Sequence, residues 1–215
     1  MQKPQAIIFD LDGVLTDTSE YHYRAWKRLA DEEGIPFTRE DNDAHLRGVG
    51  RRESLLYIFR DHHITEEQIQ EMTDRKNRYY NDMIKDMSPA DLVAGGLQLL
   101  QSIRDAGIKM AIASGSKNCR IVLERLGILH AFNGVADGDS VAHTKPAPDL
   151  FVYAAGMTTI PTSACLGVED ADAGIEAIKN AGMQALGIGP RYRFHRADKI
   201  IPTLANVSLQ AILNN

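Results

Sequence analysis

Short apolar runs alternate with helical patterns along most of the chain. The apolar runs cover residues 6–9, 108–113, 135–136, 164–168 and 184–188. Between them, apolar residues recur at helical spacing, and Gly127 and Gly182 end two of the helical patterns. Short buried strands that alternate with helices are typical of a parallel sheet covered on both faces. The pattern therefore predicts an α/β fold with a Rossmann-like parallel sheet as its core.

One long interval, residues 17–87, has helical patterns and no strand pattern. Its first helix is expected from about Asp17 to Gly34, with Asp17 and Glu20 as a capping pair. A later helix begins near Glu66 and places four apolar side chains on one seam: Ile69, Met72, Tyr79 and Met83. We therefore predict a core domain of residues 1–16 and 88–215, interrupted by an all-helical cap domain of residues 17–87.

Polar residues interrupt the apolar seams of the predicted cap. Thr18, His22 and Trp26 recur every four residues, so they share one stripe of the first helix. This stripe is either an ordinary core seam or the wall of a pocket. Lys76 falls on the seam of the long helix, where it either extends to solvent or points into a polar cavity. We favour the cavity, because this helix has many exposed positions that suit a lysine.

Composition narrows the functional classes. The chain has 215 residues, of which 44% are hydrophobic, enough to bury a full core. A net charge of −5 argues against a general nucleic-acid or anionic-membrane surface, although a local basic pocket can still hold phosphate. No long uncharged apolar run is present, and no signal-like segment precedes the first strand. We expect a cytoplasmic protein in which Cys119 and Cys165 are buried free thiols.

The first strand ends in two acids. Asp10 and Asp12 follow residues 6–9, and Gly13 comes next. If the chain stays extended there, side chains two residues apart point the same way, so the two carboxylates face one spot. Their repulsion is tolerable when a divalent cation lies between them, and hard oxygen ligands suit Mg²⁺. An Asp-Gly hairpin turn is the alternative, but a helical pattern follows instead of a second alternating strand.

Polar residues also follow the other predicted strands. In an open parallel sheet, ligands bind at the carboxyl ends of the strands. The second strand ends in residues 114–118, Ser-Gly-Ser-Lys-Asn, which open a helix whose free amides suit a phosphate. Lys145 stands in a loop with two prolines, and Glu169 and Asp170 follow a later strand. Each feature alone is common as a helix cap, a solvated lysine or a turn, but together they indicate a site.

This combination predicts phosphoryl transfer. The four carboxylates can hold Mg²⁺, and Lys145 with the cation can neutralise the phosphoryl oxygens. Asp10 can attack phosphorus with one oxygen and form an aspartyl-phosphate. Asp12 can then act as general acid and base, giving a proton to the leaving oxygen and taking one from the attacking hydroxyl.

These motifs resemble those of the haloacid dehalogenase-like superfamily. The match consists of Asp10-Leu11-Asp12-Gly13-Val14, Ser114, Lys145 and Glu169-Asp170, spread over the whole chain. The helical insertion looks like the small cap of that superfamily. The resemblance implies catalytic residues Asp10 and Asp12, and metal ligands Asp10, Asp12, Glu169 and Asp170.

Within the superfamily, the cap resembles that of its hexose-phosphate mutases. The resemblance implies that β-glucose 1-phosphate and glucose 6-phosphate are interconverted through a bisphosphate intermediate. The residues it assigns to phosphate or substrate binding are Thr18, His22, Trp26, Leu46, Gly48, Val49, Arg51, Ser54, Lys76, Ser114, Gly115, Ser116, Lys117, Asn118 and Lys145. Of these, Arg51, Ser116, Lys117 and Asn118 would hold the distal phosphate.

Three positions depart from the pattern of these mutases: Gly50 in the cap loop, Ala94 near the second linker, and Gly115 after the second strand. They affect the expected sugar contacts and hinge rather than the chemistry. The alternative function is a magnesium-dependent sugar-phosphate phosphatase of the same fold, which passes the phosphoryl group to water. Under either function we expect a monomer that acts on a small sugar phosphate, without nucleic acid or membrane as partner.

Overall fold

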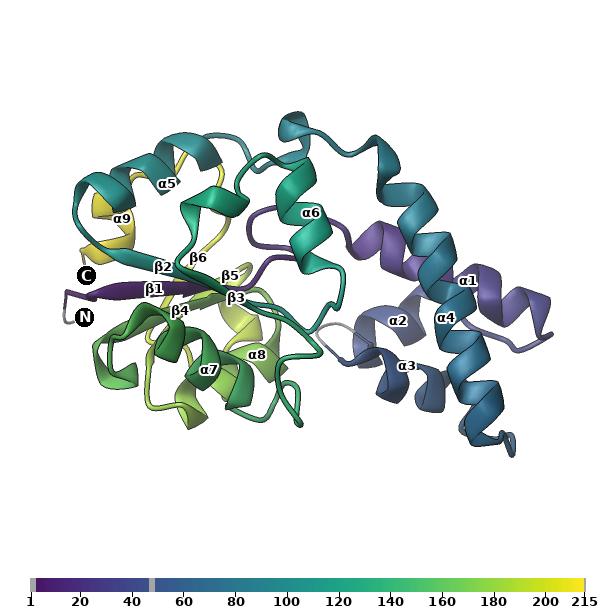
Figure 1. Ribbon diagram of the computed structural model, residues 1–215. Helices are drawn as coiled ribbons and strands as arrows, with labels where there is room; N and C mark the ends of the chain where they lie inside the picture. Colours follow the sequence, from purple (N-terminus) through teal and green to yellow (C-terminus); the bar gives the residue numbers. More distant parts are fainter. Residues whose placement is uncertain (1–2, 47–48, 215) are drawn as a thin grey trace. The chain divides into compact units, whose positions relative to one another are not determined.

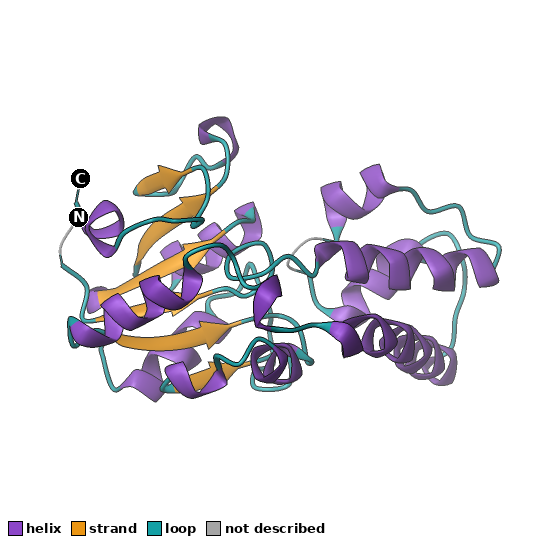
Figure 2. Ribbon diagram, turned by 90° about the horizontal axis from the view of Figure 1, so that it is seen from above, coloured by secondary structure: helices purple, strands orange, loops and turns teal. Residues whose placement is uncertain are grey.

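The computed structural model describes residues 3–46 and 49–214. The chain divides into two compact units. The first, here called the core unit, consists of Met1–Asp17 and Ser88–Asn215, and the second, here called the helical unit, consists of Thr18–Met87. The strands of the sheet all lie in the core unit, whereas the helical unit is built from helices and loops (Figure 2).

The core unit is built around a six-stranded sheet with the order β3-β2-β1-β4-β5-β6. All neighbouring strands in it run parallel. The strands are β1 (Ala6–Phe9), β2 (Lys109–Ala113), β3 (Gly134–Ala136), β4 (Cys165–Glu169), β5 (Gln184–Ile188) and β6 (Lys199–Ile201). The predicted parallel α/β core is therefore confirmed, with β1 near its centre.

Helices cover both faces of the sheet. They are α5 (Gly96–Asp105), α6 (Cys119–Arg125), α7 (Asp149–Thr158), α8 (Asp172–Asn180) and α9 (Leu209–Leu213). Helices α5, α6 and α9 lie on one face, and α7 and α8 lie on the other (Figure 1). On the second face, Ala6 and Ile8 of β1 pack into a buried cluster with Leu150 of α7 and Ile178 of α8. Burial on both faces explains why β1 reads as an unbroken apolar run.

The helical unit contains α1 (Ser19–Glu32), α2 (Arg39–His45), α3 (Arg51–Ile58) and α4 (Glu66–Met83). Capping boxes start two of these helices, with Thr38 and Asp41 at α2 and Thr65 and Gln68 at α4. Apolar side chains from α1, α3 and α4 form one buried cluster, which includes Trp26, Leu55 and Met72, and Leu46 at the end of α2 joins it. The unit therefore has a hydrophobic core of its own.

The structure corrects two details of the predicted helices. Helix α1 begins at Ser19, so its N-cap residue is Thr18 and not Asp17 of the expected capping pair. Glu20 instead pairs with Arg24 and Arg39. In α4 the buried aromatic residue is Tyr80 and not Tyr79. Tyr80 lies four residues after Lys76, and this spacing places both side chains on the same face of the helix.

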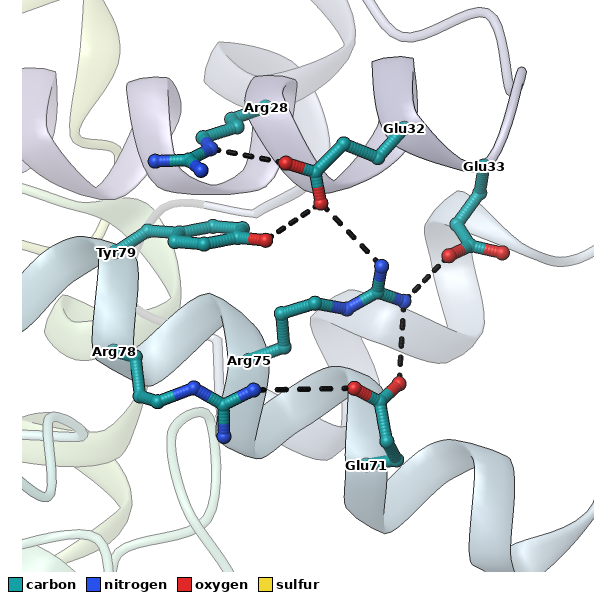
Figure 3. A network of polar contacts seen from close by, with 7 residues as sticks. All are labelled: Arg28, Glu32, Glu33, Glu71, Arg75, Arg78 and Tyr79. Atoms are coloured by element: carbon teal, nitrogen blue, oxygen red, sulfur yellow. Dashed lines mark hydrogen bonds and ion pairs between the residues drawn. The ribbon is translucent and has the colours of Figure 1, made fainter.

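Polar contacts join the outer sides of α1 and α4 (Figure 3). We call this cluster the α1–α4 network; it consists of Arg28, Glu32, Glu33, Glu71, Arg75, Arg78 and Tyr79. The Tyr79 hydroxyl donates to Glu32 at 2.6 Å, and Arg28 donates to the other Glu32 oxygen at 3.0 Å. Arg75 contacts Glu32 at 3.4 Å and Glu71 at 3.2 Å, and it also pairs with Glu33. The network therefore links the C-terminal turn of α1 to the middle of α4.

Both cysteines are free and buried, as predicted. Burial raises the pKa of the Cys119 thiol to about 12 and that of Cys165 to about 11. Both thiols therefore stay protonated at neutral pH and act as small apolar side chains. Within the part of the chain that the structure describes, no helix has the length and apolarity needed to span a membrane.

Candidate active site

The site begins where β1 ends. The backbone N–H of Asp10 donates to Val168 O of the neighbouring β4 at 2.9 Å, so Asp10 is fixed at the carboxyl edge of the sheet. The chain then turns, and the Gly13 N–H donates to Thr16 O at 2.7 Å. Gly13 has a φ of +84°, and a Cβ there would lie 2.3 Å from Asp170 Oδ2. Only glycine suits this position, because its backbone is left-handed and it passes directly over a carboxylate.

Three carboxylates gather at this edge. Ligand oxygens of Asp10, Glu169 and Asp170 lie within 4.8 Å of one another, and all three residues are buried. Asp10 comes from the end of β1, while the other two come from the end of the adjacent β4. Although the sequence analysis expected four carboxylates here, the group formed by the described residues does not include Asp12. Asp12 follows Asp10 in the turn and makes a backbone bridge with Thr16.

Lys145, from a third segment of the chain, contacts the acidic cluster. Its Nζ donates to Glu169 Oε2 at 2.8 Å and also contacts Asp10 Oδ1. Only 4% of Lys145 is exposed, and the Nζ atom lies 5.3 Å from the centre of the Phe151 ring. Burial by itself would lower the pKa of Lys145, but the carboxylates of Asp10 and Glu169 raise it above its ordinary value. The lysine therefore stays charged in the buried site.

The pKa of Asp10 is held well above its ordinary value. Burial is the main cause and the charge of Glu169 adds to it, while Lys145 acts in the opposite direction. One lysine thus does not balance the negative charge of the cluster. A divalent cation would supply the missing positive charge, and buried carboxylate oxygens are the donors that hard cations prefer. The donor set therefore fits a metal ion held by Asp10, Glu169 and Asp170.

Close packing fixes Glu169 in this cluster. Its Oε1 accepts backbone N–H groups from Asp170 and Ala171, both at 3.0 Å. A Cβ on Gly174, in the first turn of α8, would lie 1.9 Å from Glu169 Oε2. Gly174 therefore provides the space that the carboxylate occupies. Its role is not visible in the sequence, because a glycine within a helical pattern does not by itself indicate which side chain lies against it.

The loop after β2 supplies polar groups at the same edge. Ser114 is buried, and its N–H donates to Ala136 O of β3 at 3.0 Å. The Ser114 Oγ accepts from the N–H of Ser116 at 3.1 Å, and the Ser116 Oγ accepts from the N–H of Asn118 at 3.3 Å. Gly115 packs closely against the next loop, since a Cβ on Gly138 would lie 2.5 Å from Gly115 O.

Lys117 and Asn118 have different surroundings in this loop. Lys117 is half-exposed and pairs with Asp139 in the loop after β3, a partner that the sequence analysis did not identify. Asn118 is buried as the N-cap residue of α6. The structure thus brings Ser114, Lys145 and the acidic cluster to one edge of the core sheet, as the spacing of the motifs predicts for parallel strands.

In the helical unit, Lys76 and His22 face each other. Lys76 Nζ lies 2.8 Å from His22 Nδ1, and only 2% of Lys76 is exposed. The His22 ring stacks on Tyr80 with a centroid distance of 4.1 Å. Lys76 Nζ also lies 4.8 Å from the Trp26 ring centre and 5.0 Å from that of Tyr80. Lys76 therefore points inward among aromatic rings and does not extend to solvent.

The pKa of His22 is lowered well below its ordinary value. Burial is the largest cause, and the positive charges of Lys76 and Arg51 add to it. His22 is therefore neutral at pH 7 beside two cationic side chains. Such a concentration of positive charge suits an anionic ligand.

The other predicted substrate residues of the helical unit that the structure describes lie in or beside α1, α2 and α3. Thr18 is the buried N-cap residue of α1, and Leu46 is the buried C-cap residue of α2. Arg51 is the first residue of α3 and Ser54 is buried in that helix. Val49 is partly buried in the preceding loop. Gly48, the remaining predicted residue, lies outside the described residues.

Comparison with known proteins gives a family match over most of the chain. Residues 4–182 match the family model of haloacid dehalogenase-like hydrolases. A β-phosphoglucomutase from Bacillus subtilis (strain 168) is 41% identical over 212 residues, which cover 97% of this chain and 93% of that protein.

Further relatives include both mutases and phosphatases. The crystal structure of a β-phosphoglucomutase from Clostridium difficile superposes with a TM-score of 0.93 at 35% identity, covering 97% of this chain and 95% of that one. A phosphorylated carbohydrates phosphatase from Thermotoga maritima is 28% identical over 85% of this chain and 83% of that protein.

Proposed function

The chain belongs to the haloacid dehalogenase-like hydrolase family, and from this premise we propose that it is a β-phosphoglucomutase. The reaction would interconvert β-D-glucose 1-phosphate and D-glucose 6-phosphate through an aspartyl-phosphate and a bisphosphate intermediate. The observation that carries the proposal is the 41% identity to the B. subtilis mutase, which extends over 97% of this chain. On this assignment the protein is an isomerase of carbohydrate metabolism.

Asp10 is the proposed nucleophile. One of its carboxylate oxygens attacks phosphorus while the bond between phosphorus and the sugar oxygen breaks, which leaves the phosphoryl group on Asp10. Lys145, bonded to Asp10 and Glu169, holds the reacting carboxylate in place and offsets negative charge beside it. Ser114, at the end of β2 on the same edge, would donate a hydrogen bond to a phosphoryl oxygen.

Asp12 is the proposed proton carrier. Asp12 stands two residues after Asp10 in the same turn and its charge acts on Asp10, so we assign it the transfer of a proton to the departing sugar oxygen. In the second half of the cycle it would take a proton from the sugar hydroxyl that attacks the phosphoryl group on Asp10. The same residue can serve both steps, because each step restores the protonation state that the other needs.

Mg²⁺ is the proposed cofactor, held by Asp10, Glu169 and Asp170. When bound, it would neutralise charge on the carboxylates and on the phosphoryl oxygens. Asp12, which the sequence motif also assigns to the metal, is proposed as a further ligand beside its role in proton transfer. Lys117, Ser116 and Asn118 of the core unit would help to hold the distal phosphate, as would Arg51 of the helical unit.

In the helical unit, the proposed sugar-binding group is His22, Trp26 and Lys76. Its basis is the inward-pointing Lys76, which lies 2.8 Å from His22 and close to the Trp26 ring. Thr18, Leu46, Val49 and Ser54 are proposed to shape the same surface. An aromatic ring beside a buried cation suits a ligand that is partly apolar and carries an anionic group.

A coupled assay tests the mutase proposal. Glucose 6-phosphate formation would be measured from β-glucose 1-phosphate with Mg²⁺ and a trace of the bisphosphate primer, beside a measurement of free phosphate. We expect isomerisation to exceed phosphate release by at least about 100-fold. Phosphate release without isomerisation would instead establish the sugar-phosphate phosphatase, which the T. maritima relative makes the second candidate.

Arg51→Ala separates the two functions further. Because Arg51 is proposed to bind the phosphate that does not react, its loss should reduce mutase turnover by about 10- to 100-fold. The slow hydrolysis of the phosphoenzyme needs no second phosphate, so it should change by less than about threefold. The control is Arg52→Ala, which removes the neighbouring exposed arginine that pairs with Glu66. Equal losses in both reactions of the Arg51 variant would contradict a distal-phosphate role.

A further inference from the structure

A short basic segment follows β5 in a chain whose net charge is −5. We call residues 190–196, Pro-Arg-Tyr-Arg-Phe-His-Arg, the basic loop. It carries three arginines and a histidine, and it contains Tyr192, which is 83% exposed to solvent. None of the catalytic roles proposed above uses this loop.

The basic loop is anchored to the sheet. Phe194 is buried, with 3% exposed, and belongs to the same hydrophobic cluster as α7 and α8. A Cβ on Gly187 of β5 would lie 2.7 Å from the Phe194 ring, so this glycine makes room for it. The Arg193 N–H donates to Pro190 O at 3.1 Å and closes a turn. Arg196 contacts Glu176 at 3.6 Å and Asn180 at 3.3 Å on α8.

Two arginines of the anchored loop are not neutralised. Among the ion pairs formed by residues 3–46 and 49–214, none includes Arg191 or Arg193, whereas Arg196 is paired. Arg191 is exposed and Arg193 is partly exposed. Long cationic side chains in this position keep their charge directed toward solvent. The loop therefore presents uncompensated positive charge on an otherwise acidic protein.

The loop lies at the edge of the sheet that carries the candidate active site. Strand β5 is parallel to β4 and adjacent to it, and β4 is adjacent to β1 (Figure 1). All three strands therefore end at one edge, where Asp10 and Glu169 lie. Arg191 is the third residue after Ile188, the last residue of β5. Three residues span at most about 10 Å, so the basic loop begins beside this edge.

We propose that the basic loop is an anion-attracting surface that draws phosphorylated sugars toward the active-site edge, and sugar bisphosphates most strongly. This inference rests on the proposed function, since it takes a sugar phosphate as substrate. The negative net charge of the protein repels such ligands. The uncompensated charges of Arg191 and Arg193 offset that repulsion and raise the rate of productive encounter.

The size of the effect should follow the charge of the ligand. Coulomb energy is proportional to ligand charge, and a sugar bisphosphate carries about twice the charge of a monophosphate. If the two arginines raise the encounter rate of a monophosphate about threefold, they therefore raise that of a bisphosphate about ninefold. Salt screens the attraction of both ligands, because the Debye length falls from about 30 Å at 0.01 M to about 3 Å at 1 M.

The first test is kinetic and uses Arg191→Gln/Arg193→Gln in the full-length protein at low ionic strength. We expect kcat/KM for β-glucose 1-phosphate to fall about threefold, with kcat unchanged. The concentration of bisphosphate primer that gives half-maximal activation should rise about ninefold. Both differences should disappear near 0.5 M salt. An unchanged primer requirement at low salt would overturn the proposal.

Two control variants are included. The first tests whether the position of the removed charges matters, and the second tests whether the shape of the loop matters. Arg104→Gln/Arg125→Gln removes two exposed arginines at the C-terminal ends of α5 and α6, near the opposite edge of the sheet. It lowers the net charge equally and should leave the primer requirement within about twofold. Tyr192→Ala removes the exposed ring without changing charge. A ninefold effect in either control would overturn the proposal.

The second test needs no turnover, so it stands apart from the proposed function. Binding of glucose 1,6-bisphosphate and glucose 6-phosphate is measured by calorimetry in the Asp10→Asn background, with and without the two loop substitutions. Weaker binding of the bisphosphate by about ninefold, and of the monophosphate by about threefold, would support the surface even if isomerisation failed. Equal Kd values with and without the loop arginines would reject it.

Discussion

At Asp10, opposing influences act on the pKa of one side chain. Burial and the charge of Glu169 raise its pKa, while Lys145 favours the ionised form. A carboxylate must be ionised to act as the proposed nucleophile, so on that proposal the contact with Lys145 is important for reactivity as well as for position. Lys145 also donates a hydrogen bond to Glu169, which lies close to Asp170.

Asp10→Asn should abolish turnover. The amide has nearly the shape of the carboxylate but cannot form an acyl-phosphate, so we expect kcat to fall at least about 10⁴-fold. Steady-state isomerisation and phosphate release would both be measured, beside Asp105→Asn at the exposed end of α5 as control. Turnover within about 100-fold of the wild-type rate would rule out Asp10 as nucleophile.

His22 should make the stability of the chain depend on pH. Its pKa is lowered in the folded state by burial and by Lys76 and Arg51, whereas an unfolded histidine titrates near about 6.5. Below that pH the unfolded chain binds the proton more readily, so stability is lost as pH falls from about 6.5 toward the lower folded pKa.

The check is the difference in Tm between pH 7.5 and pH 5.5, measured for the wild type, His22→Gln and the exposed-site control His63→Gln. The difference should be smaller in the His22 variant, because the residue that takes up the extra proton on unfolding is absent. An identical difference in all three proteins would show that His22 does not contribute.

At the scale of elements, α1 and α4 are joined on two sides. One side carries the contact of His22 with Lys76, and the other carries the α1–α4 network (Figure 3). Arg75 immediately precedes Lys76 in α4, and Glu32 lies near the end of α1. We expect the network to limit how far one helix slides along the other, and so to help hold Lys76 beside His22.

A double-mutant cycle on Glu32 and Arg75 should therefore detect coupling. The Arg75 side chain is 21% exposed and that of Glu32 is 33% exposed, so we expect a coupling of about 0.5–1 kcal/mol in the free energy of unfolding. Urea unfolding of the two single Ala variants and the double variant provides the values. The control cycle is Asp82 and Lys85, both 64% exposed, where no measurable coupling is expected. Equal coupling energies in the two cycles would mean that the α1–α4 network does not stabilise the packing of these helices.

At the scale of the whole molecule, we expect the proposed binding of Mg²⁺ to be linked to folding. The three buried carboxylates come from β1 and β4 and meet only in the folded core. A ligand that binds only the folded state at 100 times its Kd stabilises it by about 2.7 kcal/mol. For a chain of this length the shift in Tm is about 5–10 °C.

We therefore expect Mg²⁺ to raise Tm and EDTA to reverse the increase. Differential scanning fluorimetry of the wild type and Asp170→Asn would measure it, with KCl at equal ionic strength as the control. The increase should shrink in the variant, since one ligand carboxylate is lost. If Mg²⁺ and KCl gave the same Tm in the wild type, the carboxylates would not form a magnesium site.

Most of the sheet could be predicted because its strands are buried on both faces and read as apolar runs between helices. β6 and α9 were not predicted. β6 has three residues, all only partly buried, and α9 has five. Such short elements form because neighbouring strands and helices supply their contacts, so their own patterns are too brief to indicate them.

By itself, the sequence determined which residue types stand at the strand ends, and hence the α/β core and the acids, serine and lysine expected at one edge. Tertiary structure decided which of their atoms meet. It grouped Asp10, Glu169 and Asp170 without Asp12, placed Gly174 against Glu169, and buried Tyr80 beside His22. Spacing along the chain specifies the face and edge on which a residue lies, whereas distances between side chains depend on packing among segments far apart in sequence.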